Sequence, residues 1–156
     1  MYFEDLKTGM TRQIAPVVME KSKMMAFASQ YDPIPLHLDE DYAEASPFGA
    51  LIAPGMMSFM SVWAKYLEDD FAGREVLAGK SNRVEWIKPV YMGDVLTGQA
   101  EITRCELRNR KNGLIEVTIH VNNQNGDLVM TSSTEVVVRC RAAEPVEKTG
   151  TAADCP

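Results

Sequence analysis

The sequence predicts a single α+β domain in which an antiparallel sheet packs on one long apolar helix. Residues 56–67 are apolar nearly all round, as expected of a buried helix. Four stretches rich in alternating or apolar residues follow, with turn signals between them, which is typical of antiparallel strands. A chain of 156 residues is long enough to bury one such core.

The first half of the chain predicts one strand and two short helices ahead of the central helix. Residues 10–19 fit a strand. Residues 20–30 fit a helix, because apolar side chains cluster within them at helical spacing. A second short helix is expected over residues 39–45, where three acidic residues suit the positive end of the helix dipole. Pro54 suits the first position of the central helix, where a missing amide hydrogen costs nothing.

The second half predicts four strands, over residues 77–89, 94–108, 114–123 and 128–140. The third of them alternates cleanly between apolar and polar residues from Ile115 to Asn122, which indicates one buried face and places His120 on the surface. Hairpin signals stand between the strands, at Asn112-Gly113, Asn125-Gly126-Asp127 and Met92-Gly93-Asp94.

The domain is expected to span residues 1–140. Apolar content falls after Cys140, so residues 141–156 are predicted to be a flexible tail.

The start of the chain lacks a basic segment followed by an apolar run, and no stretch approaches the length of a membrane span. A cytoplasmic protein without a membrane partner is expected.

Composition excludes several classes of function. Lys and Arg number 16 against 22 Asp and Glu, and this net charge of -6 argues against a nucleic acid held by bulk electrostatics. The cysteines, Cys105, Cys140 and Cys155, are odd in number and widely spaced, without a metal-binding pattern. We therefore expect neither a metal site nor a disulfide framework.

Residues 31–39, Tyr-Asp-Pro-Ile-Pro-Leu-His-Leu-Asp, carry the clearest chemical signal. Pro33 and Pro35 keep the residues before them out of the helical region, so the preceding helix must stop and the chain must run extended or turn. If it bends, Asp32 and His37 can reach one reacting atom and share proton transfer. A second interpretation fits the same residues, with Asp32 capping backbone amides and His37 as a core histidine.

The wider sequence resembles the MaoC-like, (R)-specific enoyl-CoA hydratase family, which has the hot dog fold. The first matching block runs from residue 27 to 56 and ends in Leu-Ile-Ala-Pro-Gly-Met. The second covers residues 84–96, Val-Glu-Trp-Ile-Lys-Pro-Val-Tyr-Met-Gly-Asp-Val-Leu. The resemblance implies a sheet wrapped around the central helix, and it spans most of residues 1–140.

That resemblance also implies roles for individual residues. Asp32 and His37 fall on the catalytic pair, and Gly55 falls on the glycine whose backbone amide polarises the thioester carbonyl. Hydration of a 2-enoyl thioester needs a water deprotonated as it attacks C3, a proton delivered to C2, and a donor for the developing oxyanion. Coenzyme A enters as part of the substrate, and no separate cofactor is expected.

The substrate-binding positions implied by the resemblance are Ile34, Pro54, Met56 and Trp63. Three of them depart from the family pattern. Ile34 replaces a common Asn or Gln, Pro54 replaces a common His or Ser, and Trp63 stands where some members carry a supporting serine, although Ser58 and Ser61 lie on the same helix. The indole of Trp63 is expected to shorten the acyl pocket, and the changes together favour an altered substrate.

Two kinds of partner are expected. The acyl-CoA carries phosphates, for which the candidate ligands are Arg83, Lys88, Arg104, Arg108, Arg110 and Lys111, although charged residues on strands are more often simply solvated. A lone hot dog sheet leaves an edge strand open. By resemblance, a homodimer or a dimer of dimers forms one continuous sheet, with acyl-thioester sites near the interface.

Three functions remain open from the sequence. Reversible hydration of a 2-enoyl-CoA to an (R)-3-hydroxyacyl-CoA is preferred. A hot dog thioesterase would use a carboxylate to activate water against the thioester carbonyl, but the spacing of Asp32 and His37 matches the hydratase pattern. A non-catalytic acyl-CoA-binding domain is the third reading, motivated by Ile34 and Pro54.

Overall fold

A computed structural model describes residues 1–69, 71 and 73–141. Its elements, in chain order, are η1 (Phe3–Asp5), β1 (Thr11–Val18), α1 (Lys21–Tyr31), α2 (Pro35–Leu38), α3 (Glu40–Glu44), α4 (Gly55–Glu68), η2 (Gly73–Glu75), β2 (Val76–Trp86), β3 (Val95–Leu107), β4 (Asn112–Asn122) and β5 (Leu128–Arg139).

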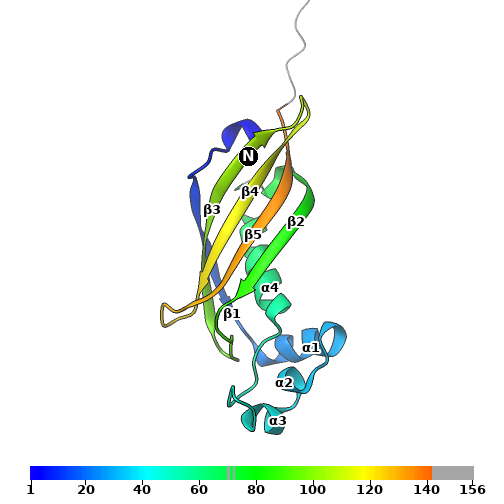
Figure 1. Cartoon of the computed structure of the whole chain (residues 1–156), viewed down its shortest axis with the longest axis vertical. Coiled ribbons are helices and arrows are strands. Elements are labelled where there is room, and N and C mark those ends of the chain that lie inside the picture. Colours follow the sequence, from blue (N-terminus) through cyan, green and yellow to red (C-terminus); the bar gives the residue numbers. More distant parts are fainter. Residues whose placement is uncertain (70, 72, 142–156) are drawn as a thin grey trace, which may run out of the picture.

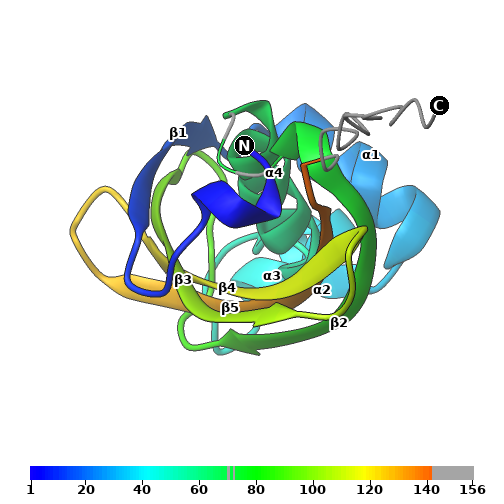
Figure 2. The ribbon, with the colours of Figure 1, turned by 90° about the horizontal axis from the view of Figure 1, so that it is seen from above.

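Within the described residues the strands form one antiparallel sheet of five, in the order β1-β3-β4-β5-β2. The sheet curves around α4, which lies in its concave face (Figure 2). The three short helices α1, α2 and α3 gather beyond the end of the sheet at which α4 begins (Figure 1). A sheet wrapped around a central helix is the arrangement that the sequence predicts.

The core lies between α4 and the sheet. On β4 the apolar residues of the predicted alternation, from Ile115 to Val121, are at most 1% exposed, while His120 is exposed as expected. They face the buried positions of α4, which include Met57, Phe59, Val62 and Tyr66. Burying one large apolar side chain contributes roughly 1.5–3 kcal/mol to the stability of the fold. Several such side chains fix α4 on the sheet, and the position of its first turn is fixed with it.

The predicted hairpin between β3 and β4 is present, but its turn lies earlier than the sequence predicts. Asn112 and Gly113 are the first residues of β4 rather than its preceding turn. Residues 108–111 make the turn, because the side-chain oxygen of Asn109 accepts the backbone N–H groups of Lys111 and Asn112, at 2.8 and 3.2 Å. Gly113 is needed for space instead, since a Cβ there would lie 2.3 Å from the ring of Phe3.

The other turn signals correspond to turns. Gly93 and Gly126 have φ of 86° and 80°, the left-handed region that suits glycine. Asn123 stabilises the second turn by accepting the backbone N–H groups of Asn125 and Asp127, each at 3.0 Å.

The end of the described chain is attached to its beginning. Arg141 donates its backbone N–H to the Glu4 carboxylate at 3.0 Å and its guanidinium to Asp5 at 2.7 Å. These contacts lower the pKa of the Glu4 carboxyl, with the backbone N–H of Arg141 as the largest cause. Arg141 was predicted to start a flexible tail, and the rest of that tail lies outside the described residues. Across the described part of the chain, no helix is long and apolar enough to cross a membrane.

Candidate active site

Asp32 and His37 come together because the chain reverses between them. Helix α1 ends at Tyr31, and the N–H of Asp32 still bonds to the carbonyl of Ala28 at 2.9 Å. Pro33 stops the helix, and the N–H of Ile34 then folds back to the carbonyl of Asp32 at 2.8 Å. The imidazole Nε2 of His37 lies 3.3 Å from Asp32 Oδ2. The predicted bend is therefore present.

Of the two courses expected for this segment, extended or turned, the structure has the turned one. The chain does not stay extended after the second proline, because Pro35 occupies the first turn of the four-residue helix α2 and His37 lies within it. Proline is well suited to that first turn, where its missing N–H has no helical acceptor. The N–H of His37 bonds to the carbonyl of Ile34 at 3.1 Å. The short helix, rather than an extended segment, aims the imidazole back at Asp32.

A main-chain carbonyl fixes the protonation pattern of the imidazole. His37 Nδ1 lies 2.8 Å from the carbonyl oxygen of Ile52, which can only accept a hydrogen bond, so Nδ1 carries a proton. The other ring nitrogen, Nε2, faces the Asp32 carboxyl at 3.3 Å. His37 is 5% exposed, while the Asp32 side chain is 40% exposed. Within the pair His37 is thus the buried group, and the carboxyl of Asp32 is the one open to the pocket.

Helix α4 begins at the same place. Pro54 is its N-cap and Gly55 its first residue, one position later than the sequence predicts. The backbone N–H groups of a first helical turn have no intrahelical acceptor, and the helix dipole adds partial positive charge there. Gly55 is packed against the indole of Trp86, since a Cβ at position 55 would lie 2.7 Å from Trp86 Cε2 and 2.8 Å from Nε1. Only glycine fits beneath this ring.

These groups line one pocket of about 500 Å³. Asp32 and His37 form one part of its wall, and the start of α4 forms another. Most of the remaining wall is apolar. The full lining is Asp32, His37, Phe48, Ile52, Ala53, Gly55, Met56, Ser58, Trp86, Ile87, Lys88, Pro89 and Val90. An apolar pocket with a few polar groups aimed into it is the usual form of a small-molecule site.

The structure brings together four of the seven predicted site residues. Asp32, His37, Gly55 and Met56 line the pocket, and Ile34, Pro54 and Trp63 do not. Ile34 is 42% exposed at the start of α2, and Pro54 is buried behind Gly55. Their side chains do not reach the pocket.

Trp63 lines a second pocket, of about 410 Å³, farther along α4. Its other walls include Phe59, Met60 and Leu67 from α4 and the first part of β2. The site pocket contains Gly55, at the start of α4, and Trp86, at the end of β2. The second pocket contains later residues of α4 and earlier residues of β2. The two pockets therefore follow one another along the seam between this helix and this strand.

Sequence reasoning missed Trp86 and Ser58 as lining residues. Trp86 lies in the second block of the family resemblance, so its aromatic character was a signal, but its contact with Gly55 depends on how β2 packs beside α4. Ser58 was noted in the sequence only as one of two serines on the central helix, because nothing in the spacing distinguishes it from Ser61. Only the folded chain turns Ser58 toward the pocket.

The predicted basic residues are widely separated. Lys88 lines the site pocket, where its Nζ is 2.6 Å from Asp127 Oδ1. The turn that carries Arg108, Arg110 and Lys111 lies at the other end of the sheet, away from α1, α2 and α3 (Figure 1). Lys88 is thus the one candidate cation of the six that lines the site pocket in the described part of the chain.

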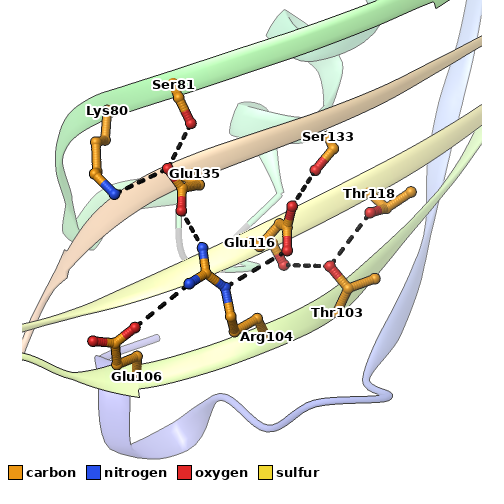
Figure 3. Close-up of polar contacts among 9 residues, drawn as sticks. All are labelled: Lys80, Ser81, Thr103, Arg104, Glu106, Glu116, Thr118, Ser133 and Glu135. Atoms are coloured by element: carbon orange, nitrogen blue, oxygen red, sulfur yellow. Dashed lines mark hydrogen bonds and ion pairs between the residues drawn. The ribbon is translucent and has the colours of Figure 1, made fainter.

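Arg104 is committed to a polar network on the outer face of the sheet (Figure 3). Its guanidinium pairs with Glu106, Glu116 and Glu135, and Glu116 also accepts the Ser133 hydroxyl at 2.5 Å. The hydroxyl of Ser81 and then the ammonium of Lys80 lower the pKa of the Glu135 carboxyl to about 2. Glu116 alternates with residues that face α4, so this network lies on the side of the sheet away from the helix.

Comparison with known proteins places this architecture in context. The family model described as MaoC like domain matches residues 5–125. The uncharacterised protein YdeM of Bacillus subtilis is 26% identical over 140 residues, covering 89% of this chain and 99% of the relative. The (R)-specific enoyl-CoA hydratase of Rhodospirillum rubrum is 29% identical over 102 residues, covering 65% of this chain and 69% of that enzyme.

A solved structure agrees in fold. The crystal structure of the MaoC-like dehydratase from Rhodospirillum rubrum matches with a TM-score of 0.82 at 26% identity, covering 92% of this chain and 99% of that one. The similarity confirms the hot dog fold that the sequence predicts.

Proposed function

Because the chain belongs to the MaoC-like domain family, we propose that it is an acyl-thioester hydratase that reversibly converts a 2-enoyl-CoA into an (R)-3-hydroxyacyl-CoA. One observation carries the proposal. The Asp32–His37 pair and the first amide of α4 line the same pocket, so a proton-transfer pair faces a hydrogen-bond donor across a space that a thioester can fill. The (R) configuration rests on the hydratase relative.

The pair supplies the proton transfers. A water molecule held between Asp32 and His37 adds its oxygen to C3 and gives one proton to the pair, while the C2=C3 π electrons move toward the thioester carbonyl. The pair returns a proton to C2, which restores the carbonyl and leaves a 3-hydroxyacyl product. The proton on Nδ1 stays with the Ile52 carbonyl, so the exchange involves Nε2 and the Asp32 carboxyl.

The start of α4 supplies electrostatic stabilisation. Negative charge develops on the thioester oxygen as the enolate forms. The backbone N–H of Gly55 is a fixed donor at the positive end of the helix dipole, and such donors favour the charged intermediate over the neutral substrate. The indole of Trp86 covers Gly55 and keeps bulk water from competing for this amide.

The acyl chain is proposed to run from the site pocket along the seam between α4 and β2. Trp63 lies five residues beyond Ser58 on α4, about 7.5 Å along the helix axis. In this position its ring closes the path of longer chains through the second pocket. The proposal keeps Trp63 as a determinant of chain length while moving it out of the immediate reaction site.

A homodimer, or a dimer of dimers, is proposed as the working form. Strand β2 is an edge of the sheet, and all but two of its eleven residues are exposed. Beside it, Met60 and Leu67 expose 47% and 38% of their surface on α4. Open edges and apolar patches of this kind are usually covered. Sedimentation equilibrium of the full chain tests this, and a monomer at micromolar concentration would contradict it.

The activity is tested by incubating the protein with crotonyl-CoA. We expect the enoyl absorbance to disappear and 3-hydroxybutyryl-CoA to form, with no free thiol. Appearance of free coenzyme A would instead indicate a thioesterase. Binding without either reaction would indicate a non-catalytic acyl-CoA-binding domain. Chiral analysis of the product checks the (R) assignment, and an (S) product would contradict it.

A further inference from the structure

Ser58 has a buried hydroxyl without a partner. The residue is 1% exposed, and its Oγ makes no hydrogen bond to any other group in the described part of the chain. Its backbone is ordinary, since its N–H bonds to the carbonyl of Pro54 at 3.2 Å as the first regular bond of α4. Buried hydroxyls are almost always hydrogen-bonded, and one left without a partner costs free energy. Among the described residues Tyr66 and Ser132 also have such a hydroxyl, but only Ser58 lines the site pocket, where a ligand atom can act as its partner.

The place of Ser58 indicates what that atom belongs to. Ser58 lies in the wall of the pocket that holds Asp32, His37 and Gly55. It follows Gly55 by three residues, so the two share one face of α4. Side chains on a helix lean toward its N-terminus, which carries the Ser58 hydroxyl toward the amide of Gly55.

No other aliphatic hydroxyl is available to a ligand there. Among the described residues that line the pocket, the side chains with polar atoms are Asp32, His37, Ser58, Trp86 and Lys88. The first two are committed to each other, and Lys88 pairs with Asp127. Ser58 is thus a short, neutral donor in an otherwise apolar part of the wall, which suits a neutral oxygen atom.

We propose that Ser58 is a substrate-positioning residue whose hydroxyl donates a hydrogen bond to an oxygen of the acyl thioester, one helical turn beyond Gly55. The identity of the ligand rests on the proposed function. The oxygen belongs either to the thioester carbonyl or to C3 of the hydrated product. In both cases the hydrogen bond fixes the acyl group along α4, with its reacting carbons beside the Asp32–His37 pair.

The test compares Ser58→Ala with Ser132→Ala. Ser132 on β5 is a matched control, because it is 3% exposed, its Oγ also lacks a partner in the described chain, and it does not line the site pocket. Removing either hydroxyl is expected to leave the melting temperature of the free protein unchanged or higher. Only Ser58→Ala is expected to lower kcat/KM for crotonyl-CoA, by roughly tenfold.

Binding measurements assign the oxygen. Calorimetric titration with butyryl-CoA gives an affinity without turnover. Because the active enzyme would dehydrate (R)-3-hydroxybutyryl-CoA, that ligand is titrated in a His37→Ala background, with and without the Ser58 substitution. An equal loss of affinity for both ligands in Ser58→Ala assigns the hydrogen bond to the thioester carbonyl, and a loss for the hydroxy compound alone assigns it to the C3 oxygen. Ser58→Cys, which keeps nearly the same volume but donates weakly, should reproduce the loss if Ser58→Ala fails to fold.

The outcomes separate this inference from the proposed activity. Unchanged kcat/KM and unchanged affinities in a folded Ser58 variant would overturn the inference and leave the hydratase intact. If the wild type binds butyryl-CoA but does not hydrate crotonyl-CoA, the proposed activity fails and the affinities still decide the role of Ser58. A wild type that binds neither thioester would overturn both.

Discussion

The indole of Trp86 lies so close to Gly55 that even a methyl group added at position 55 would come within 2.7 Å of its ring. The first amide of α4 is therefore held between a fixed helix and an aromatic cover. The contact joins the start of α4 to the end of β2, two segments that are 31 positions apart in the chain. It makes the geometry of the proposed oxyanion donor depend on a residue from another element.

Gly55→Ala is expected to displace either the indole or the start of α4 and to lower kcat for crotonyl-CoA hydration at least tenfold, because a misplaced donor loses much of its stabilising effect. Steady-state kinetics check the loss. In a Trp86→Ala background the same substitution meets no ring, so it should cost much less. Equal costs in the two backgrounds would refute the steric explanation.

Asp32→Asn and His37→Ala are each expected to lower kcat by roughly two or more orders of magnitude, the usual contribution of acid–base groups. Each removes one of the two groups that face each other at 3.3 Å. His120→Ala is the control, because His120 is exposed on the outer face of the sheet. Near-normal turnover in either variant of the pair would exclude the proposed proton transfer.

Trp63→Ala should extend the range of accepted acyl chains, because removing the indole joins more of the second pocket to the path along α4. The measurement is kcat/KM for a series of 2-enoyl-CoA substrates of increasing length. Met92→Ala serves as control, since Met92 is 49% exposed and lines neither pocket. An unchanged chain-length profile would remove Trp63 from the substrate path.

Lys88→Ala is expected to raise KM for crotonyl-CoA severalfold while leaving KM for crotonyl-N-acetylcysteamine, a thioester without phosphates, unchanged. The lysine lines the pocket and can exchange Asp127 for a phosphate. The effect should shrink as salt is added, because exposed charges are screened. Arg108→Ala at the other end of the sheet provides a matched loss of charge. Equal changes for the two thioesters would rule out phosphate recognition by Lys88.

Glu135→Gln is expected to lower the melting temperature at neutral pH. The pKa of Glu135 is about 2 in the folded protein against 4.5 for an ordinary glutamate, so the ionised carboxyl stabilises the fold above about pH 4.5. This stabilisation is lost as the pH falls from 4.5 toward 2. The difference in melting temperature between the two proteins should narrow through that window. A difference that stays constant with pH would contradict the ionic account, and Glu44→Gln, on an exposed helix position, controls for a changed net charge.

The parts of the fold that follow a local rule could be predicted from the sequence. The alternation in β4 and the apolar run of α4 each report burial directly, and both elements lie where their patterns indicate. Pro33 marked the end of α1 because its effect on the backbone is local. The Asn112-Gly113 signal marked the β3–β4 hairpin but misplaced its turn, since Asn109 holds the turn and Gly113 is required by the ring of Phe3.

The site was predictable only where a residue type carries its own chemistry. An acid near a histidine, here Asp32 and His37, indicates proton transfer. The 3.3 Å distance between them, however, depends on the one-turn helix α2. The roles of Trp86 and Ser58 depend on how α4 lies on the sheet, which the spacing of residues within one element does not encode. Ile34 and Pro54 stood at family positions, yet neither residue lines the pocket.

The acceptor for His37 Nδ1 is the main-chain carbonyl of Ile52, a residue that also lines the pocket. No substitution at position 52 deletes a carbonyl. The backbone there is further held by an antiparallel bridge between Ile52 and Tyr91. The backbone of Ile52 therefore orients the imidazole of His37, whichever side chain stands at position 52. The side chain at this position can be replaced to suit another substrate without removing that hydrogen bond. If the proposed hydratase activity holds, substitutions at position 52 are the first to try for changing which acyl groups are accepted.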